Sequence, residues 1–403
     1  LYAIDDNQAP SLNLASSRIY EGSSASKSAQ TLLLLPSKSR LPSLTRMPML
    51  RLSLFVLLGW AGPFLARGSS NGPAGQALKM VSVPLDNYNN LTYITKLMLG
   101  TPPQKFLVML DSAGTTWVPA YYCTQAEPCF EHKMYDWSKS TTQSSDWEDG
   151  ATPFGRGNVT GYVFRDAHEL SGVSLGNLQF VNGIGFHGVP SFVDKPFDGV
   201  FGLRLSANYT LYEMAKSGVI SSPKVGLYFS TDVTAPGEAL FGGANEHHYQ
   251  GSMTFVDALD SAFQVHLNGY KVAGQRERLQ ASWAQPAPTE PFIGGPASEI
   301  KKINTLLGAR KIETGKYELR CNMRPSDVTF IFGELEIVLR PEEYVLKVET
   351  TSGTTCYSGY VEAEAVANAS WHLGLVFLRL FYTVLEAPLE PSGNGRVGFA
   401  IAK

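Results

Sequence analysis

Short apolar runs alternate with turn residues over most of the chain. From Met80 onward, runs rich in Val, Ile, Leu, Phe and Tyr are separated by Gly, Pro and Asn, which is typical of strands joined by tight turns. The pattern predicts strands at 91–99, 105–110, 159–164, 224–229, 238–241 and 328–332. Helical spacing is confined to 211–216 and 298–307, so we expect a mostly β protein.

The first 80 residues follow a different pattern. Residues 47–68 combine a short basic start, an apolar run and small residues before Gly68, which is typical of a signal peptide. A signal peptide should begin a protein, so we expect residues 1–46 to be a disordered upstream translation or gene-model extension. If they are instead a genuine tail, the apolar run becomes an internal membrane anchor. Residues 69–80 are expected to be a short linker.

Composition narrows the function classes. The 403 residues are 44% hydrophobic and 17% charged, with a net charge of −3, so no basic field points to nucleic acid. The apolar run is too short for a stable membrane span. The polar, breaker-rich segment 230–237 marks a lobe boundary between 81–231 and 238–403.

Four cysteines and four glycosylation sequons fit passage through the secretory pathway. Three cysteine pairings are possible, and we expect the local one, Cys123 with Cys129 and Cys321 with Cys356. The sequons begin at Asn90, Asn158, Asn208 and Asn368. We expect a secreted glycoprotein, with an endolysosomal location as the alternative, and a monomer.

Several motifs occur in a fixed order along four-fifths of the chain. They are Gly100-Thr101-Pro102-Pro103-Gln104, the run from Phe106 through Asp111-Ser112-Ala113-Gly114 to Trp117-Val118-Pro119, Phe197-Asp198-Gly199-Val200-Phe201-Gly202-Leu203, Gly237-Glu238-Ala239-Leu240-Phe241-Gly242-Gly243 and the closing strands from Trp371 to Ala400. This succession, with the cysteine spacing, resembles the pepsin/cathepsin D-like aspartic protease family. The resemblance implies a bilobal acid protease fold, with a cleft between two lobes that holds a peptide.

The resemblance also implies a catalytic pair of carboxylates, one ionised and one protonated, that hold a water between them. Asp111 occupies the first position, and Ser112 is acceptable where the family has Thr or Ser. Ala113 replaces the family's Gly and adds a Cβ where the loop turns tightly. Together with a spacing to Trp117 that is one residue short, this predicts a reshaped loop.

The second catalytic loop departs further from the family pattern. Counting back from Gly295-Pro296, the family's Asp-Thr-Gly falls on Ala287, Pro288 and Thr289. The carboxylate is thus a methyl, and the Thr that would hydrogen-bond across the lobes is a proline. Glu290 is the nearest acid, but it is displaced by about 10 Å at full extension, so we expect a solvated loop charge.

The flap that would close over the cleft is also altered. The segment 152–161 matches the family's flap, with Phe154 in place of the usual Tyr and Gly155 after it. The hydroxyl that would hydrogen-bond Trp117 is therefore missing, and the Asn158 sequon lies just beyond the flap tip. The dozen or so residues between Gly68 and Val81 are too few for the family's propeptide.

These departures favour a secreted pseudoprotease that binds a peptide or protein in its cleft, with Asp111 as a remnant. We expect neither a cofactor nor a metal. The alternatives are an active or weakly active aspartic endopeptidase working at acid pH, and a structural or immunogenic secreted protein whose cleft has no role.

Overall fold

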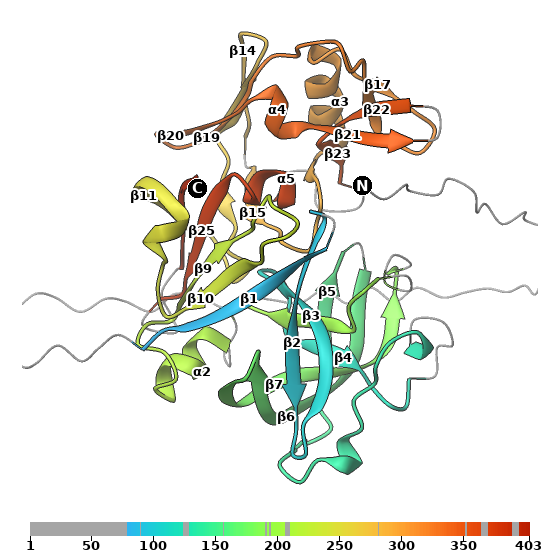
Figure 1. Ribbon diagram of the computed structural model, residues 1–403, viewed down its shortest axis with the longest axis vertical. Helices are drawn as coiled ribbons and strands as arrows, with labels where there is room; N and C mark the ends of the chain where they lie inside the picture. Colours follow the sequence, from blue (N-terminus) through green and yellow to red (C-terminus); the bar gives the residue numbers. More distant parts are fainter. Residues whose placement is uncertain are drawn as a thin grey trace, which may run out of the picture. The chain divides into compact units, whose positions relative to one another are not determined.

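The computed structural model describes residues 79–403, apart from 89, 124–128, 156, 190–191, 193–194, 206–209, 281, 351–352, 364–369 and 389–394 (Figure 1). The expected extension, the signal peptide and most of the linker lie outside the described residues, as do Asn208 and Asn368. Strands dominate this part of the chain and its helices are short, which confirms the mostly β fold.

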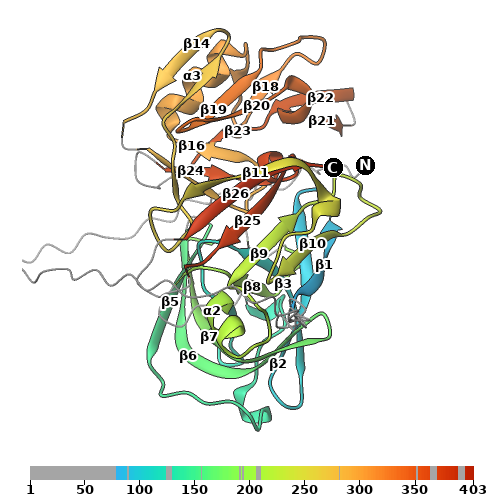
Figure 2. The same ribbon diagram turned by 90° about the vertical axis from the view of Figure 1, so that its left-hand side faces the viewer.

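The largest sheet joins the two halves of the chain (Figures 1 and 2). In spatial order its strands are β11 (Tyr249–Asp257), β26 (Arg396–Ala402), β25 (Phe381–Glu386), β9 (Lys224–Tyr228), β10 (Gly237–Phe241), β1 (Val81–Tyr88), β2 (Thr92–Leu99), β3 (Gln104–Asp111), β8 (Gly199–Gly202), β4 (Trp117–Pro119), β7 (Val173–His187), β6 (Gly157–Leu170) and β5 (Asp149–Phe154). The C-terminal strands β25 and β26 therefore complete a sheet that the N-terminal half begins.

Three smaller sheets are built from the C-terminal half alone. One contains β12 (Val265–His266), β15 (Trp283–Pro286), β24 (Ser370–Leu373), β16 (Ile293–Gly295) and β23 (Tyr360–Glu362). The second contains β14 (Gln275–Arg278), β13 (Gly269–Val272), β19 (Val328–Phe332) and β20 (Leu335–Leu339). The third contains β17 (Arg310–Lys311), β18 (Tyr317–Leu319), β22 (Gly353–Ser358) and β21 (Val345–Thr350).

Helical segments in the described chain are few and short. They are α2 (Thr210–Lys216), α3 (Ala297–Leu306), α4 (Pro341–Tyr344), α5 (Leu375–Leu378) and the 3₁₀ turns η1 (Trp137–Lys139) and η3 (Glu246–His248). Helix α3 buries Ile300, Ile303 and Asn304 on one face, which is the spacing of an amphipathic helix. None of these helices has the length and hydropathy that crossing a membrane requires.

Alternation along the strands accounts for the core. In β1 the side chains of Val81, Val83 and Leu85 are buried while the residues between them are exposed, as the two-residue period of a strand requires. The first half of β1 pairs with β10 and its second half with β2, so this strand ties two parts of the large sheet together.

A second, smaller core lies under the flap hairpin formed by β5 and β6. It is rich in aromatic side chains and includes Trp117, Phe154, Phe186, Phe192 and Phe197. This cluster holds the flap against β4 and β7, close to the loop that carries Asp111.

Candidate active site

The two loops expected to carry the catalytic pair occupy equivalent places in the two halves. Asp111 ends β3, which pairs in parallel with β8, with Asp111 opposite Gly202. Ala287 directly follows β15, which pairs in parallel with β24, with Pro286 opposite Leu373. Both residues line the same pocket. This repeated arrangement supports the assignment of Ala287 as the counterpart of Asp111.

The Asp111 carboxyl is buried, with 5% of the residue exposed. Burial raises its pKa to about 6, against weaker opposing effects from the backbone N–H groups of Ala113 and Gly114 and from the Arg204 guanidinium. The Ala113 N–H donates to Asp111 Oδ1 at 2.9 Å. Below about pH 6 this carboxyl is mainly protonated.

The loop after Asp111 accommodates Ala113 without strain. Ala113 is not among the described residues with positive φ, so the strain expected from its Cβ is absent. Close packing falls on the next residue instead, because a Cβ on Gly114 would lie 2.7 Å from Asp111 Oδ2. Gly202 on β8 is constrained in the same way, since a Cβ there would lie 2.5 Å from the Gly114 carbonyl oxygen.

The second loop is a tight turn that brings no carboxylate to Asp111. The Glu290 N–H donates to the Ala287 carbonyl at 2.9 Å, which leaves Pro288 and Thr289 at the corners of the turn. Proline suits the first corner because its φ is fixed. The groups that shift the pKa of Asp111 include no carboxylate from the described residues.

A side-chain hydrogen bond joins the two loops. Ser112 Oγ donates to the backbone carbonyl of Pro286 at the end of β15. Pro288 has no hydroxyl with which to return this bond from the other side.

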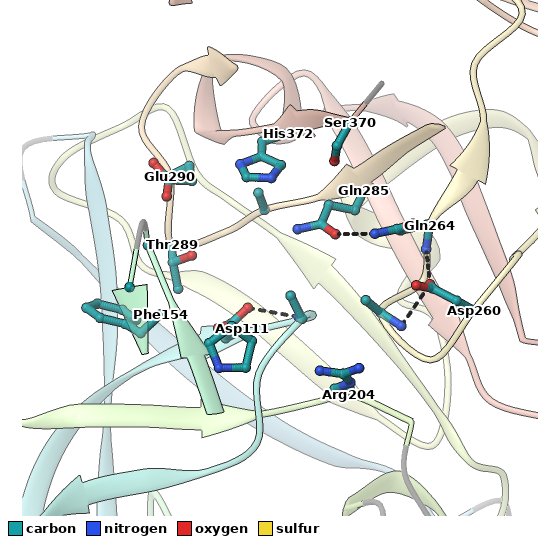
Figure 3. A pocket seen from close by; sticks show the side chains of 16 residues that line it. Asp111, Phe154, Arg204, Asp260, Gln264, Gln285, Thr289, Glu290, Ser370 and His372 are labelled. Carbon is teal, nitrogen blue, oxygen red and sulfur yellow. Dashed lines mark hydrogen bonds between the residues drawn. The ribbon is translucent and has the colours of Figure 1, made fainter. Parts of the chain in front are cut away.

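The pocket between the loops has a volume of about 350 Å³, within the range of ligand sites (Figure 3). Its lining comprises Asp111, Ala113, Pro153, Phe154, Gly155, Gly157, Arg204, Asp260, Ala262, Gln264, Gln285, Ala287, Thr289, Glu290, Ser370 and His372. The expected cleft residues Phe154, Gly155, Thr289 and Glu290 are thus brought together with Asp111.

Three residues expected in the cleft lie behind its wall. Ser112 is fully buried and directed at Pro286, Trp117 is fully buried behind Phe154, and Pro288 is buried in its turn. Glu290 differs from its expectation in the opposite way. It is half-buried in the pocket wall and has an interaction partner of its own, so it is not a solvated loop charge.

The sequence reasoning missed several polar residues of the pocket. Arg204 immediately follows the 197–203 motif, so its place beside Asp111 was available from the motif alone. His372 lies inside the closing motif, where burial lowers the pKa of its imidazole. Asp260 and Gln264 lie on a loop that carries no sequence motif from which their place in the pocket could be predicted. Figure 3 shows Asp111 and Arg204 facing Gln285, Ser370 and His372.

The flap closes onto aromatic side chains. Residues Thr152 and Pro153 of β5 pair with Val159 and Asn158 of β6. Phe154 packs edge-on against Trp117, with ring centroids 5.1 Å apart. The Trp117 Nε1–H is buried and has no hydrogen-bond partner among the described residues, as the loss of the flap hydroxyl predicts.

The cysteine pairing is the local one. Cys123 bonds to Cys129 with Cα atoms 6.0 Å apart, and Cys321 bonds to Cys356 with Cα atoms 5.3 Å apart. Two of the sequon asparagines are within the described chain. Asn158 is exposed on the flap strand β6, and Asn90 lies in the turn between β1 and β2.

The chemistry of this pocket centres on Asp111, because Asp260 and Glu290 also line it but neither is among the groups that shift the pKa of Asp111. Asp111 can hold a water or hydrogen-bond a peptide oxygen, depending on its protonation. One carboxyl cannot be both the base that takes a proton from water and the acid that donates to the peptide in the same step. Within the described residues, no group of His, Cys, Asp and Glu side chains is arranged to bind a metal.

Comparison with known proteins identifies the family of this chain. The sequence model of the eukaryotic aspartyl proteases matches residues 92–402. Cathepsin D of Gallus gallus is 30% identical over 332 residues, which cover 78% of this chain and 82% of that protein. Cathepsin E of Aquarana catesbeiana is 30% identical over 335 residues, covering 79% and 81%. Vacuolar protease A of Aspergillus fumigatus is 30% identical over 334 residues, covering 80% and 81%. The chain belongs to the eukaryotic aspartyl protease family.

Proposed function

We propose that this chain is a secreted, proteolytically inactive aspartyl protease homologue that binds a peptide or protein segment in its cleft as a monomer. The observation that carries the proposal is the methyl of Ala287 at the position equivalent to Asp111. Hydrolysis by this family's chemistry needs a second carboxyl there, and its loss removes the shared proton.

The binding half of the proposal rests on what the pocket retains. The flap hairpin, the buried Asp111 and the polar walls remain, so a peptide backbone would still meet hydrogen-bonding groups. The two disulfides fit an oxidising compartment, and exposed Asn158 fits glycosylation in the secretory pathway. Residues 81–231 and 238–403 remain our proposed lobes.

An acid-pH assay tests both parts of the proposal, the lack of proteolysis and the binding of a peptide. The purified protein is incubated with denatured globin between pH 3 and 6, and binding of a fluorescent, peptide-like aspartic protease inhibitor is measured in parallel. We expect saturable inhibitor binding without cleavage. If neither binding nor cleavage is observed, the structural or immunogenic alternative remains. Secretion is tested by recovering the protein from culture medium, against an endolysosomal fraction.

An active endopeptidase is the second candidate, and the named relatives favour it, because cathepsins D and E and vacuolar protease A are each 30% identical to this chain over 78–80% of its length. The pKa of Asp111, about 6, would also suit a protonated acid at low pH. Cleavage of globin that the inhibitor abolishes, and that Asp111→Asn removes, would establish this candidate and reject the binding protein.

A further inference from the structure

Arg204 is held rigidly in the wall of the cleft. It follows β8, and its backbone N–H donates to the Gly114 carbonyl of the Asp111 loop at 3.3 Å. Its Nε–H donates to Ser261 Oγ at 3.1 Å, and the next N–H, that of Leu205, donates to the Ser261 carbonyl at 2.7 Å. Backbone bonds thus hold the residue in place and the Ser261 hydroxyl orients its guanidinium, which lowers the entropy cost of using it for binding.

The outer edge of the Arg204 guanidinium has no partner among the described residues. No carboxylate of that part of the chain lies within 4.0 Å of it as an ion pair, and Nε makes the only hydrogen bond recorded for the group there. The four N–H groups of Nη1 and Nη2 remain for a ligand. A guanidinium presents these donors in a planar fork that matches a carboxylate.

Four other titratable groups line the pocket, namely Asp111, Asp260, Glu290 and His372. Asp111 is mainly neutral below its pKa of about 6. Asp260 accepts hydrogen bonds from the N–H groups of Ala262 and Gln264, and Glu290 has its own partner. The pocket therefore offers the Arg204 cation to a ligand most strongly at mildly acid pH, where fewer carboxylates compete for it.

A second group points to a polar ligand. The Ser370 hydroxyl lines the same pocket, and the residue is only 2% exposed. Its Oγ has no hydrogen-bond partner in the described structure. Because burying a hydroxyl without a hydrogen-bond partner is unfavourable, this atom is suited to a group that the described chain does not supply.

We propose that the cleft selects peptides carrying a carboxylate, which Arg204 binds through its Nη1 and Nη2 donors while Ser370 bonds a polar atom of the same ligand. The inference rests on the proposed peptide-binding function and gives it a substrate class. The carboxylate can come from an Asp or Glu side chain or from a peptide C-terminus, since both present the same two oxygens.

Fluorescence anisotropy with matched peptides tests the inference. The probes are labelled octapeptides that are identical except for a central Glu, Gln or Lys, all with amidated C-termini, and the Gln peptide is also made with a free C-terminus. Measurements are made at about pH 5.5, where a Glu carboxylate is ionised. We expect the Glu peptide, or the free-acid peptide, to bind about tenfold or more tightly than the neutral amide. Whichever of these two peptides binds more tightly than the neutral amide identifies the source of the carboxylate.

Variants of the chain then test which residue causes the preference for the carboxylate peptide. We expect Arg204→Ala to abolish it, Arg204→Lys to retain part of it, and Ser261→Ala to weaken it by loosening the guanidinium. Arg278→Ala, on the exposed strand β14, is the matched control and should leave it unchanged. Thermal unfolding checks that each variant is folded.

The outcomes separate the two proposals. Binding of all peptides with equal affinity, or a preference that survives Arg204→Ala, would overturn the carboxylate inference and leave the peptide-binding proposal standing. No binding of any peptide by the folded wild-type protein would overturn both.

Discussion

The side chains around Asp111 determine which substitutions are expected to create or remove proteolytic activity. Asp111 is buried at the end of β3 and receives the Ala113 N–H. Its counterpart, Ala287, offers a methyl to the same pocket. The missing part of the proposed catalytic pair is thus one carboxyl and its supporting hydroxyl, within a fold that is otherwise retained.

We expect the double change Ala287→Asp with Pro288→Thr to create acid protease activity at least about 100-fold above the wild-type background, because general acid–base catalysis contributes about that much or more. Cleavage of a quenched fluorescent peptide at about pH 4 measures it. Adding Asp111→Asn should remove the gain. A folded double variant without activity would show that features other than the missing carboxyl prevent hydrolysis.

Trp117 gives a second prediction at this scale. Within the part of the chain that the structure describes, its buried Nε1–H has no hydrogen-bond partner, and its ring packs edge-on against Phe154. We expect Phe154→Tyr to supply the missing acceptor and raise the free energy of unfolding by about 1 kcal/mol in urea titrations. Phe197→Tyr is the control, because it buries a hydroxyl in the same cluster without reaching Trp117, and it should destabilise. Equal effects of the two changes would contradict the assignment.

At the scale of elements, the flap is the hairpin whose surroundings most affect the cleft. Its residues Pro153, Phe154, Gly155 and Gly157 line the pocket, while Asn158 beside them is exposed. A glycan on Asn158 would stand at the edge of the opening and restrict the size of ligand that enters.

We expect Asn158→Gln, expressed in a eukaryotic host, to speed association of a folded protein-sized ligand while leaving a short peptide unaffected. Surface plasmon resonance measures both rates, and the mass of the protein reports loss of the glycan. Thr92→Ala, which removes the Asn90 sequon outside the pocket lining, is the matched control. Unchanged association after proven loss of the glycan would refute the gating role.

The same elements show what the sequence predicts well. Alternation and turn residues predicted β2, β3, β19 and α3 close to their observed positions, because local periodicity reflects which face is buried, whereas β6 runs well beyond the predicted 159–164. The extension of one sheet through β25 and β9 was not predicted, since pairing between distant strands leaves no local signal. The position of Arg204 could have been predicted from the 197–203 motif, but its hydrogen bond to Ser261 could not, because Ser261 lies in another part of the chain.

At the scale of the whole molecule, two buried titratable groups act on stability in opposite directions. The folded pKa of Asp111 is raised to about 6, so the folded state binds more protons than the unfolded state and stability falls as pH rises from about 4 to 6. The folded pKa of His168 is lowered to about 4 by burial, so stability rises with pH from about 4 to 6.5. Each effect amounts to about 3 kcal/mol.

Removing either group should therefore reveal the pH dependence of stability that the other group contributes. We expect the free energy of unfolding of Asp111→Asn to increase with pH between about 4 and 6, and that of His168→Asn to decrease, with the wild type flatter than both. Urea unfolding at several pH values measures the slopes. His168 Nδ1 lies 2.9 Å from the Asp166 carbonyl oxygen, and its Nε2 has no partner among the residues with described structure, so a proton on Nε2 would find no acceptor there. Three parallel curves would contradict this balance.

The sheet that runs from β11 to β5 also constrains how the protein is made. Strand β9 pairs with β25, and β25 with β26, although these partners are separated from β9 by most of the C-terminal half. During vectorial synthesis, β9 emerges long before residues 381–402 and presents an unpaired edge until they follow. We therefore expect a premature stop codon that removes only β26 to leave β11 without its neighbour and one edge of β25 unpaired, while β25 keeps its pairing with β9, and to make the product prone to degradation.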